Sequence, residues 1–445
     1  MKKRKKIKVG VFGTRRGKCM MSVMLQHPEA ELAAICDYSE AALKKCAELA
    51  KGNDAKMTCY RDFDKFLEHD LDAVVLANYA NEHAPYAVQA LNSGRHVCSE
   101  VVACQNMAEA VQLVEAAEKS RKVYAFAENY CYFKGTLEMQ RLYRAGEIGA
   151  FLHAEGEYVH DCESIWPNIT GGQRNHWRNW VPATFYCTHS IGPIVTITGT
   201  RPTRVTAYET PNINKRRFGG RAADGAVILC QMSNGGTMKA LPWCNFKRHP
   251  ESVWYCVYGA KGMMETDRWE STFNRVHVYR EGFAKPSDLS AEAIRAKGEA
   301  TSETRAKEGE NHPSSEQDFS YKPAFSHSTE LSRKIGGHGG SDFYTMHYFL
   351  QKILGRPEGK YAIDVYQALD MTLPGLLGYR SIVNGNIPID IPDFRNKQIR
   401  EKYRNDRWCC DPKLAGPGQP KHSCSGGEVK VSESVYRKQQ KEFPR

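Results

Sequence analysis

Short apolar runs and longer amphipathic stretches alternate along the first third of the chain. The short runs fit buried strands, whereas the longer stretches repeat their apolar residues at helical spacing. Strands are predicted at 7–12, 31–36, 57–60, 73–77, 96–98 and 122–126, with helices near 17–26, 39–51, 61–68, 82–93 and 106–119. Strands that alternate with helices in this order predict a doubly wound parallel sheet.

The pattern changes after Glu128, where strand-like segments begin to follow one another. The Asn234-Gly235 pair between two of these segments is a strong hairpin signal. Strands are predicted at 151–160, 203–209, 226–232, 237–243 and 253–258, and helices at 188–199, 341–355 and 363–384. This part of the chain therefore predicts an α/β domain with an open, mainly antiparallel sheet and flanking helices.

A chain of 445 residues, 41% of them hydrophobic, is long enough for two domains. We expect a dinucleotide-binding domain at residues 1–128, a substrate-binding domain at 129–399 and a basic, loosely ordered tail at 400–445. Residues 284–334 are poor in apolar side chains and interrupted by prolines, so they predict a long polar insertion. This insertion is either a lid over a site or a surface loop without function.

The distribution of charge argues against a protein that binds nucleic acid. The formal net charge is +11, but the basic residues gather at both ends of the chain, as in solvated tails, and not on a surface that binds nucleic acid.

No apolar run approaches the ~18 residues of a membrane span. Residues Lys2–Lys6 lead into the first strand without a signal sequence, so a cytoplasmic protein is expected.

The cysteines indicate reduced thiols. There are fifteen of them, an odd number scattered along the chain, which does not fit a disulfide framework. Cys409 and Cys410, together with His422 and Cys424, fit ordinary tail residues better than a zinc site. No metal site is therefore predicted.

The first predicted strand, Ile7 to Phe12, runs into the glycine turn Gly13-Thr14-Arg15-Arg16-Gly17 and then into a helix. A helix N-terminus after such a turn offers free backbone N–H groups and a partial positive charge to a pyrophosphate. Arg15 stands where the common G-x-G-x-x-G pattern has its second glycine, so this phosphate contact departs from the usual one. Asp37 ends the second strand, where its carboxylate can accept both ribose hydroxyls and would repel a 2′-phosphate. The expected cofactor is therefore NAD and not NADP.

Three histidines stand in informative settings. Tyr158 and His160 are two residues apart on a strand, so both side chains leave the same face. Tyr186 and His189 are three apart at the start of a helix and again share a face. His338 lies in Gly336-Gly337-His338-Gly339-Gly340, a backbone that can approach a ligand closely. The five side chains can converge on one pocket and move protons there; the alternative for each Tyr and His is a packed, hydrogen-bonded place in the core.

A further aromatic segment is Trp177-Arg178-Asn179-Trp180. It offers either a surface on which a sugar ring can stack or an anchor for the interface between the two domains.

Three segments resemble the Gfo/Idh/MocA family, named after glucose–fructose oxidoreductase and inositol dehydrogenase. They are Gly94-Arg95-His96-Val97-Cys98-Ser99-Glu100, Ala77-Asn78 with His83, and Val257-Tyr258-Gly259-Ala260-Lys261-Gly262. The likeness covers roughly residues 7–395. It implies a Rossmann domain followed by an open-sheet α/β domain, with a sugar bound between them above the nicotinamide.

Two positions depart from the dehydrogenases of that family. These enzymes usually read Glu-Lys-Pro where this chain has Glu100-Val101-Val102, and valine cannot move a proton as the lysine does. They also usually carry an Asp four residues before a catalytic histidine, where this chain has Phe185 before His189. An ordinary sugar dehydrogenase built in this way would lack its usual acid/base groups.

A narrower branch of the family accommodates these differences. Glu128-Asn129, Tyr158-x-His160, Tyr186-x-x-His189 and the glycine-flanked His338 together resemble the NAD-dependent glycosidases of glycoside hydrolase family 109, typified by α-N-acetylgalactosaminidase. The resemblance implies hydride transfer from sugar C3 to NAD+ and removal of the acidified C2 proton as the aglycone leaves C1. Water then adds to C1, and the retained NADH reduces the ketone, so the net reaction is hydrolysis.

The residues and the resemblance together assign roles. Tyr158 and His160 are assigned to proton transfer around C2 and C3, and Tyr186, His189 and His338 to holding and polarising hydroxyls or the departing oxygen. Cofactor contacts are assigned to Gly13, Thr14, Arg15, Arg16, Gly17, Asp37, Asn78, His83, Glu100 and Asn129, and substrate contacts to Glu128, Trp177 and Arg178.

Two other functions remain open at this point. An NAD-dependent dehydrogenase would oxidise a sugar or glycoside and release the keto product. A non-catalytic sugar or cofactor sensor would have kept the fold and lost the lysine. The expected partner in each case is a small carbohydrate bound by a homo-oligomer, and neither nucleic acid nor a membrane is expected.

Overall fold

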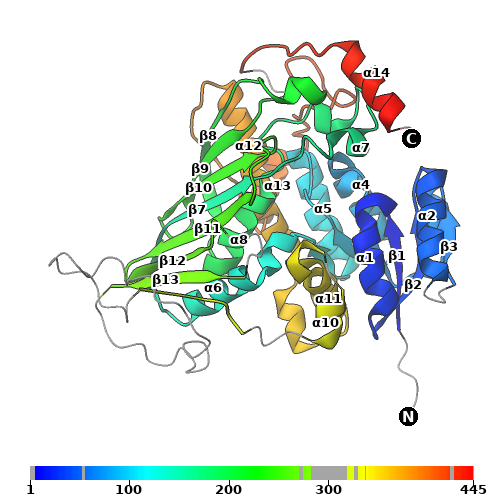
Figure 1. Ribbon diagram of the computed structural model, residues 1–445, viewed down its shortest axis with the longest axis horizontal. Coiled ribbons are helices and arrows are strands. Elements are labelled where there is room, and N and C mark those ends of the chain that lie inside the picture. Colours follow the sequence, from blue (N-terminus) through cyan, green and yellow to red (C-terminus); the bar gives the residue numbers. More distant parts are fainter. Residues whose placement is uncertain are drawn as a thin grey trace.

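The computed structural model describes residues 6–52, 56–269, 274–281, 318–324, 329–335, 337–420 and 425–443. Most of the predicted polar insertion lies outside the described residues, as do Gly336, His422 and Cys424. Two sheets lie on opposite sides of the molecule, with helices between them (Figure 1).

The first sheet is parallel throughout, with the strand order β3-β2-β1-β4-β5-β6. Its strands are β1 (Ile7–Phe12), β2 (Ala30–Cys36), β3 (Thr58–Tyr60), β4 (Ala73–Leu76), β5 (His96–Ser99) and β6 (Tyr124–Phe126). Its helices are α1 (Thr14–Gln26), α2 (Glu40–Lys51), α3 (Phe63–Glu68), α4 (His83–Asn92) and α5 (Met107–Ser120). The central strands β1 and β4 are buried at every residue but Lys8 and are otherwise apolar, because helices cover both faces of the sheet. The predicted doubly wound sheet is confirmed, and its strand order reverses between β1 and β4.

The second sheet has nine strands in the order β14-β13-β12-β11-β7-β10-β9-β8-β15. Only β7 and β10 pair in parallel, and the other neighbours are antiparallel. Its strands are β7 (Phe151–Val159), β8 (Pro202–Glu209), β9 (Ala226–Met232), β10 (Thr237–Trp243), β11 (Ser252–Gly259), β12 (Gly262–Thr266), β13 (Val276–Arg280), β14 (Asp318–Tyr321) and β15 (Ile389–Asp390). The predicted open, mainly antiparallel sheet is confirmed, including the turn at Asn234-Gly235 between β9 and β10.

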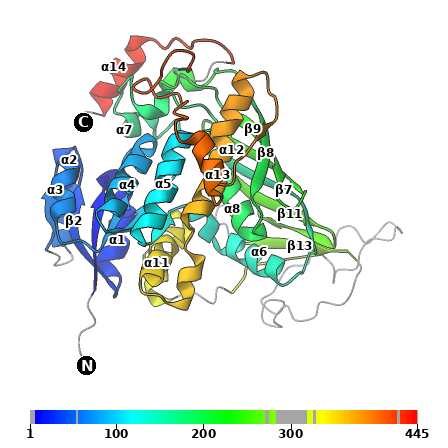
Figure 2. The ribbon, with the colours of Figure 1, turned by 180° about the vertical axis from the view of Figure 1, so that it is seen from behind.

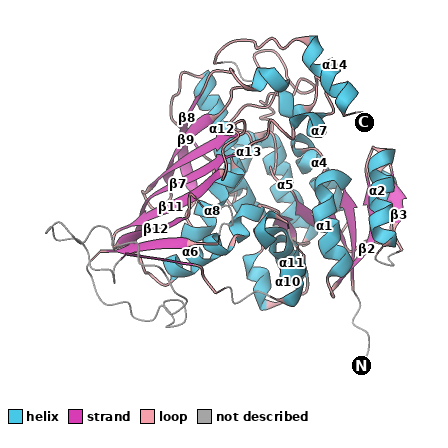
Figure 3. Ribbon diagram, in the orientation of Figure 1, coloured by secondary structure: helices cyan, strands magenta, loops and turns pink. Residues whose placement is uncertain are grey.

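Helices cover only the inner face of the second sheet (Figures 2 and 3). They are α6 (Lys134–Arg144), α8 (Thr188–Thr198) and α12 (Val365–Val383). The sheet also presents exposed apolar side chains, namely Leu152, Tyr208, Leu229 and Tyr258. Within the described part of the chain, no helix has both the length and the apolar character needed to span a bilayer.

The second half of the chain returns to the first domain. Helix α10 (Glu330–Lys334) leads to α11 (Ser341–Ile353), which packs against α1 and against the 3-10 turn η2 (Asn129–Tyr132). Helix α12 packs in turn against α5. Figures 1 and 2 both show α11 beside α1, so a late segment of the sequence helps to form the junction between the domains.

The expectation of a loosely ordered tail after residue 400 is wrong for much of its length. Helix α13 (Lys397–Tyr403) is tied to α5, because Arg400 lies 2.6 Å from Glu118. Helix α14 (Glu433–Glu442) packs against α7 (Trp166–Thr170) and the 3-10 turn η4 (Lys215–Phe218). The Tyr436 hydroxyl on α14 is buried and donates a hydrogen bond to the Gly219 carbonyl at 2.8 Å.

Candidate active site

A cavity of about 220 Å³ lies where the carboxyl ends of β1 and β5 meet the second domain. The first domain contributes Arg16 and Glu100 to its wall. The Tyr and His side chains that the sequence singled out come from three separate segments, and all of them line the cavity: Tyr158, His160, Tyr186, His189 and His338.

Close packing of α8 on β7 brings two of these pairs together. Gly156 on β7 faces the backbone of Ser190 on α8, and a Cβ at Gly156 would lie only 1.9 Å from the Ser190 oxygen. The missing side chain therefore lets the helix rest directly on the strand. As a result the Tyr158 ring lies 4.7 Å from the His189 ring, measured between centroids.

A buried carboxylate orients His189. The Nδ1 atom of His189 lies 2.7 Å from Oε1 of Glu128, whose side chain is fully buried behind the histidine. Because a carboxylate only accepts hydrogen bonds, it holds the proton on Nδ1 and leaves Nε2 as the basic nitrogen. Glu128 was assigned to substrate contact, but the structure does not bring it to the cavity wall; it acts on His189.

Burial sets the protonation of the aromatic hydroxyls. It raises the pKa of Tyr158 well above its ordinary value, so this phenol is protonated at neutral pH. It raises the pKa of Tyr186 to about 12, although the Arg178 guanidinium acts in the opposite direction. Burial also lowers the pKa of His160, whose Nε2 lies 3.3 Å from Glu251. A neutral imidazole and protonated phenols therefore face the same space.

His338 reaches the cavity from an unusual backbone. Its own φ is 45°, and Gly337 before it has φ 136°. A Cβ at Gly337 would lie 2.6 Å from Oδ2 of Asp342, so only glycine fits there. The His338 Nδ1 atom lies 2.9 Å from the same carboxylate oxygen, and this contact fixes the orientation of the imidazole ring.

Arg16 joins the two domains beneath the cavity. Its Nε donates to Glu100 at 2.8 Å, and its Nη2 donates to Asp342 at 2.7 Å. Asn129 donates to the same Asp342 carboxylate at 3.1 Å. Burial opposes ionisation of Asp342, but hydrogen bonds from His338 and Arg16 and the charge of Arg16 hold its pKa well below the ordinary value. The sequence assigned Arg16 to the cofactor phosphates; here it is the central cation of a network that ends at His338.

The edge of the first sheet fits a dinucleotide. Gly13 has φ 90°, and a Cβ there would lie 2.3 Å from the Ala77 oxygen, so β1 and β4 end in close contact. Asp37 at the end of β2 accepts hydrogen bonds from the Thr14 N–H at 2.7 Å and from its hydroxyl at 2.8 Å. Both polar atoms of the Asn78 amide are buried without a partner among the described residues. These groups lie where the strand order reverses, which is where Rossmann sheets bind dinucleotides, and the unpaired amide is a group that such a ligand would satisfy.

Three residues assigned to the cofactor have other contacts. Arg15 donates through Nη1 to the Asn168 carbonyl of the second domain at 2.8 Å. His83 is buried with Nδ1 2.9 Å from the Val102 carbonyl, and burial lowers its pKa to about 4. Gly17 serves packing, because a Cβ there would lie 2.7 Å from the Val11 side chain.

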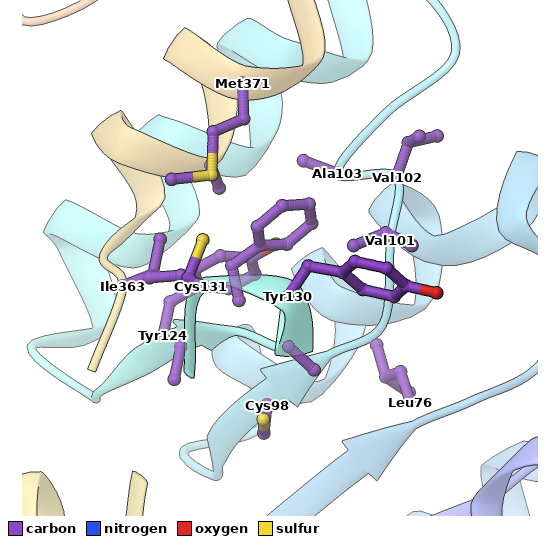
Figure 4. Packing of buried hydrophobic residues seen from close by; sticks show 14 of the residues in the cluster. Leu76, Cys98, Val101, Val102, Ala103, Tyr124, Tyr130, Cys131, Ile363 and Met371 are labelled. Carbon is purple, nitrogen blue, oxygen red and sulfur yellow. The ribbon is translucent and has the colours of Figure 1, made fainter. Parts of the chain in front are cut away.

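The aromatic segment after α7 contributes to the cavity. Trp177 and Arg178 both line it, and the guanidinium lies 4.5 Å from the Trp177 ring centre and 5.2 Å from that of Tyr186. The two positions that depart from the dehydrogenase pattern are buried apart from the cavity: Phe185 packs against Trp177, and Val101 belongs to the same buried cluster as Tyr130 (Figure 4).

Comparison with known families supports both halves of this description. Residues 7–128 match the model of an oxidoreductase family with an NAD-binding Rossmann fold, the Gfo/Idh/MocA family. Residues 224–401 match the model of the glycosyl hydrolase 109 C-terminal domain. The chain thus joins a segment that matches the Rossmann domain of the Gfo/Idh/MocA family to one that matches the glycosyl hydrolase 109 C-terminal domain.

Individual proteins show the same pairing. A glycosyl hydrolase family 109 protein of Bacteroides thetaiotaomicron is 27% identical over 424 residues, which covers 87% of this chain and 84% of the relative. A family 109 protein of Porphyromonas gingivalis is 26% identical over 412 residues, with coverage of 87% and 84%. Among solved structures, an inositol dehydrogenase homologue of Azotobacter vinelandii has a TM-score of 0.64 at 15% identity and covers 87% of this chain and 98% of its own. The latter likeness concerns the fold.

Sequence reasoning missed several side chains of this site. Asp342 comes two residues after the glycine run and was a readable signal, because a carboxylate four residues after His338 can hydrogen-bond to it. Glu251, which faces His160, precedes a strand and carries no such signal. The remaining ones line the cavity from loops and strand ends: Tyr130, Cys162, Lys215 and Cys244.

Proposed function

We propose that the protein is an NAD-dependent glycosidase. The observation that carries this proposal is the convergence of two tyrosines and three histidines on one cavity at the carboxyl edge of an NAD-binding sheet. The similarity to curated glycosyl hydrolase family 109 proteins over 87% of the chain supports it.

The cofactor would be held by the turn after β1, by Asp37 at the ribose and by the amide of Asn78. When bound, NAD supplies a reversible oxidation of a sugar hydroxyl, which makes the C–H bond beside the resulting ketone acidic. The protein must then bind the sugar, take and return protons, and admit one water molecule.

His189 is suited to accept the proton of the hydroxyl that is oxidised. Glu128 stabilises the imidazolium that forms, in the way that a buried carboxylate supports a catalytic histidine elsewhere. The geometry therefore gives His189 a more active role than the holding role expected from the sequence.

Tyr158 and His160 are suited to the proton transfers at the neighbouring carbon. Their ring centroids lie 5.3 Å apart, and the neutral His160 can take a C2 proton while the protonated phenol hydrogen-bonds the ring oxygens. As the C2 proton leaves, the C1–O bond breaks and the departing oxygen takes a proton. Addition of water to C1 and return of a proton to C2 complete the balance, so one glycoside and one water give one sugar and one alcohol.

The deciding experiment incubates the purified protein and NAD+ with aryl α- and β-glycosides in deuterated water. Release of the aglycone with deuterium at sugar C2 and without net NADH is the expected result. Net accumulation of NADH with an intact glycosidic bond would instead identify a dehydrogenase. Hydrolysis without C2 exchange, measured by NMR, would rule out the elimination route.

We further propose a homo-oligomer in the cytoplasm. The second sheet exposes Leu152, Tyr208 and Leu229, and a second copy would cover such a surface. None of the described cysteines forms a disulfide, which fits a reducing compartment. Sedimentation velocity of the wild type and of a Leu229→Lys variant tests the association.

A further inference from the structure

Among the described residues, two cations that line the cavity have no carboxylate partner. Lys215 on η4 and Arg178 on the 3-10 turn η3 (Trp177–Asn179) both line the cavity. Lys215 is only 5% exposed, and the Nε atom of Arg178 is buried without a hydrogen-bond partner. Among the residues that the structure describes, neither forms an ion pair with Asp or Glu, in contrast to Arg16.

The carboxylates nearest the cavity already have partners. Glu100 pairs with Arg16, Glu128 holds the Nδ1 proton of His189, and Glu251 contacts the neutral His160, and none of the three forms an ion pair with Lys215 or Arg178. A buried charge that lacks a counter-ion is costly, and proteins rarely retain one without use. The unpaired cations therefore require a negative group from elsewhere.

Two neighbouring thiols are affected by the same excess of positive charge. Cys162 and Cys244 line the cavity beside Lys215. A hydrogen bond with Cys162, together with the charges of Lys215 and Arg178, lowers the pKa of the Cys244 thiol. One thiolate can balance one cation, and the second cation still faces the cavity.

We propose that the glycoside bound in this cavity carries an anionic group, a carboxylate or a sulfate or phosphate ester, which Arg178 and Lys215 hold together. Arg178 is fixed by its stacking on Trp177 and Tyr186, so its planar fork of donors is already oriented. Lys215 adds a second positive charge from the 3-10 turn η4. The assignment of the anion to a glycoside rests on the proposed function. Binding of an anionic sugar in this cavity does not depend on that function.

The test compares matched neutral and anionic ligands. The substrates are 4-nitrophenyl glucosides and galactosides of both anomers, with the corresponding uronides, 6-sulfates and 6-phosphates. An anionic member is expected to exceed its neutral parent by about 10- to 100-fold in kcat/KM, as charge-assisted hydrogen bonds at a buried site would give. Uronides and esters form separate arms, so the series also identifies which anion the site prefers.

The second part of the test uses variants of the two cations. Lys215→Met and Arg178→Met should remove the preference for the anionic ligand by about 10-fold or more, whereas Lys215→Arg should retain most of it. Arg216→Met is the matched control, because Arg216 is the exposed neighbour on the same turn. If Lys215→Met does not fold, the comparison of Lys215→Arg with Lys215→Gln replaces it.

Calorimetry with free D-glucuronate, D-galacturonate, the 6-sulfates, the 6-phosphates and the neutral sugars separates the two proposals. Tighter binding of an anionic sugar that is lost in Lys215→Met, without hydrolysis of any glycoside, would overturn the glycosidase and keep the anion site. Hydrolysis of neutral glycosides with no gain for any anionic member would keep the glycosidase and overturn the anion site. Equal or undetectable binding of anionic and neutral sugars, without hydrolysis, would also overturn it.

Discussion

Glu128 and His189 form a buried pair, with Oε1 of the glutamate 2.7 Å from Nδ1 of the histidine and only the histidine at the cavity wall. A carboxylate in this place selects one tautomer and stabilises the charged ring, and an amide of the same shape does neither reliably.

Glu128→Gln should therefore lower kcat strongly and change KM little. Loss of a carboxylate behind a catalytic histidine costs up to about 10⁴-fold in comparable arrangements, and we expect at least about 10²-fold here. The measurement is aryl-glycoside turnover with saturating NAD+, accompanied by circular dichroism to verify folding. A folded variant with wild-type kcat would show that His189 does not depend on this carboxylate.

Tyr158→Phe should reduce turnover by about 10²-fold or more if the hydroxyl takes part in proton transfer. The variant keeps the ring, so its packing against Tyr130 and His189 should persist. Deuterium incorporation at sugar C2 should fall with turnover. Tyr132→Phe is the matched control, because its hydroxyl donates to the Tyr361 carbonyl away from the cavity. Near-normal turnover of Tyr158→Phe would remove the hydroxyl from the mechanism.

Local patterns predicted the paired site residues well. A period of two brought Tyr158 and His160 together at the end of β7, although His160 lies one residue beyond the strand, and helical spacing brought together Tyr186, just before α8, and His189 on its first turn. Strands of the first sheet were readable because helices bury both of their faces, which leaves continuous apolar runs.

Long-range partners were not readable from such patterns. Arg16 lies in the glycine turn, where a phosphate contact is the ordinary expectation. No neighbouring residue in the sequence indicates that Asp342 is its partner. The docking of the tail depends on Tyr436 and Gln439, two buried side chains within a largely polar helix. Lys215 is one of three consecutive cations, and only the three-dimensional turn decides which of them points into the cavity.

The network around Asp342 should make stability depend on pH. Since His338 and Arg16 hold the pKa of Asp342 below the ordinary value for an aspartate, the ionised form contributes stability in full above about pH 5, and this contribution is lost as the pH falls below about 4. Asp342→Asn should cost about 1–3 kcal/mol at pH 7, because it removes one of the two carboxylates that pair with Arg16 and the acceptor of the His338 hydrogen bond. The difference between wild type and variant should shrink as the pH falls from 5 toward 3.

Urea unfolding at pH 7, 5, 4 and 3 measures this effect. Asp390→Asn is the control, because Asp390 pairs with Arg204 on the exposed surface and should contribute less than about 1 kcal/mol. A difference between wild type and Asp342→Asn that stays constant from pH 7 to pH 3 would contradict the lowered pKa.

The backbone before His338 provides the last prediction. Gly337→Ala adds a methyl group 2.6 Å from Oδ2 of Asp342, so either the loop or the carboxylate must move and His338 must move with it. Gly355→Ala is the matched control, because Gly355 also has a positive φ, of 65°, but nothing lies within 4 Å of the added carbon. Both variants should lose about 1–2 kcal/mol of stability from the left-handed backbone. Only Gly337→Ala should also lose kcat/KM, by about 10²-fold, as a displacement near 1 Å at a reacting group would cause. If the two variants lose activity equally, or if neither does, the position of His338 does not limit the reaction, and its role in holding and polarising hydroxyls or the departing oxygen would have to be given up.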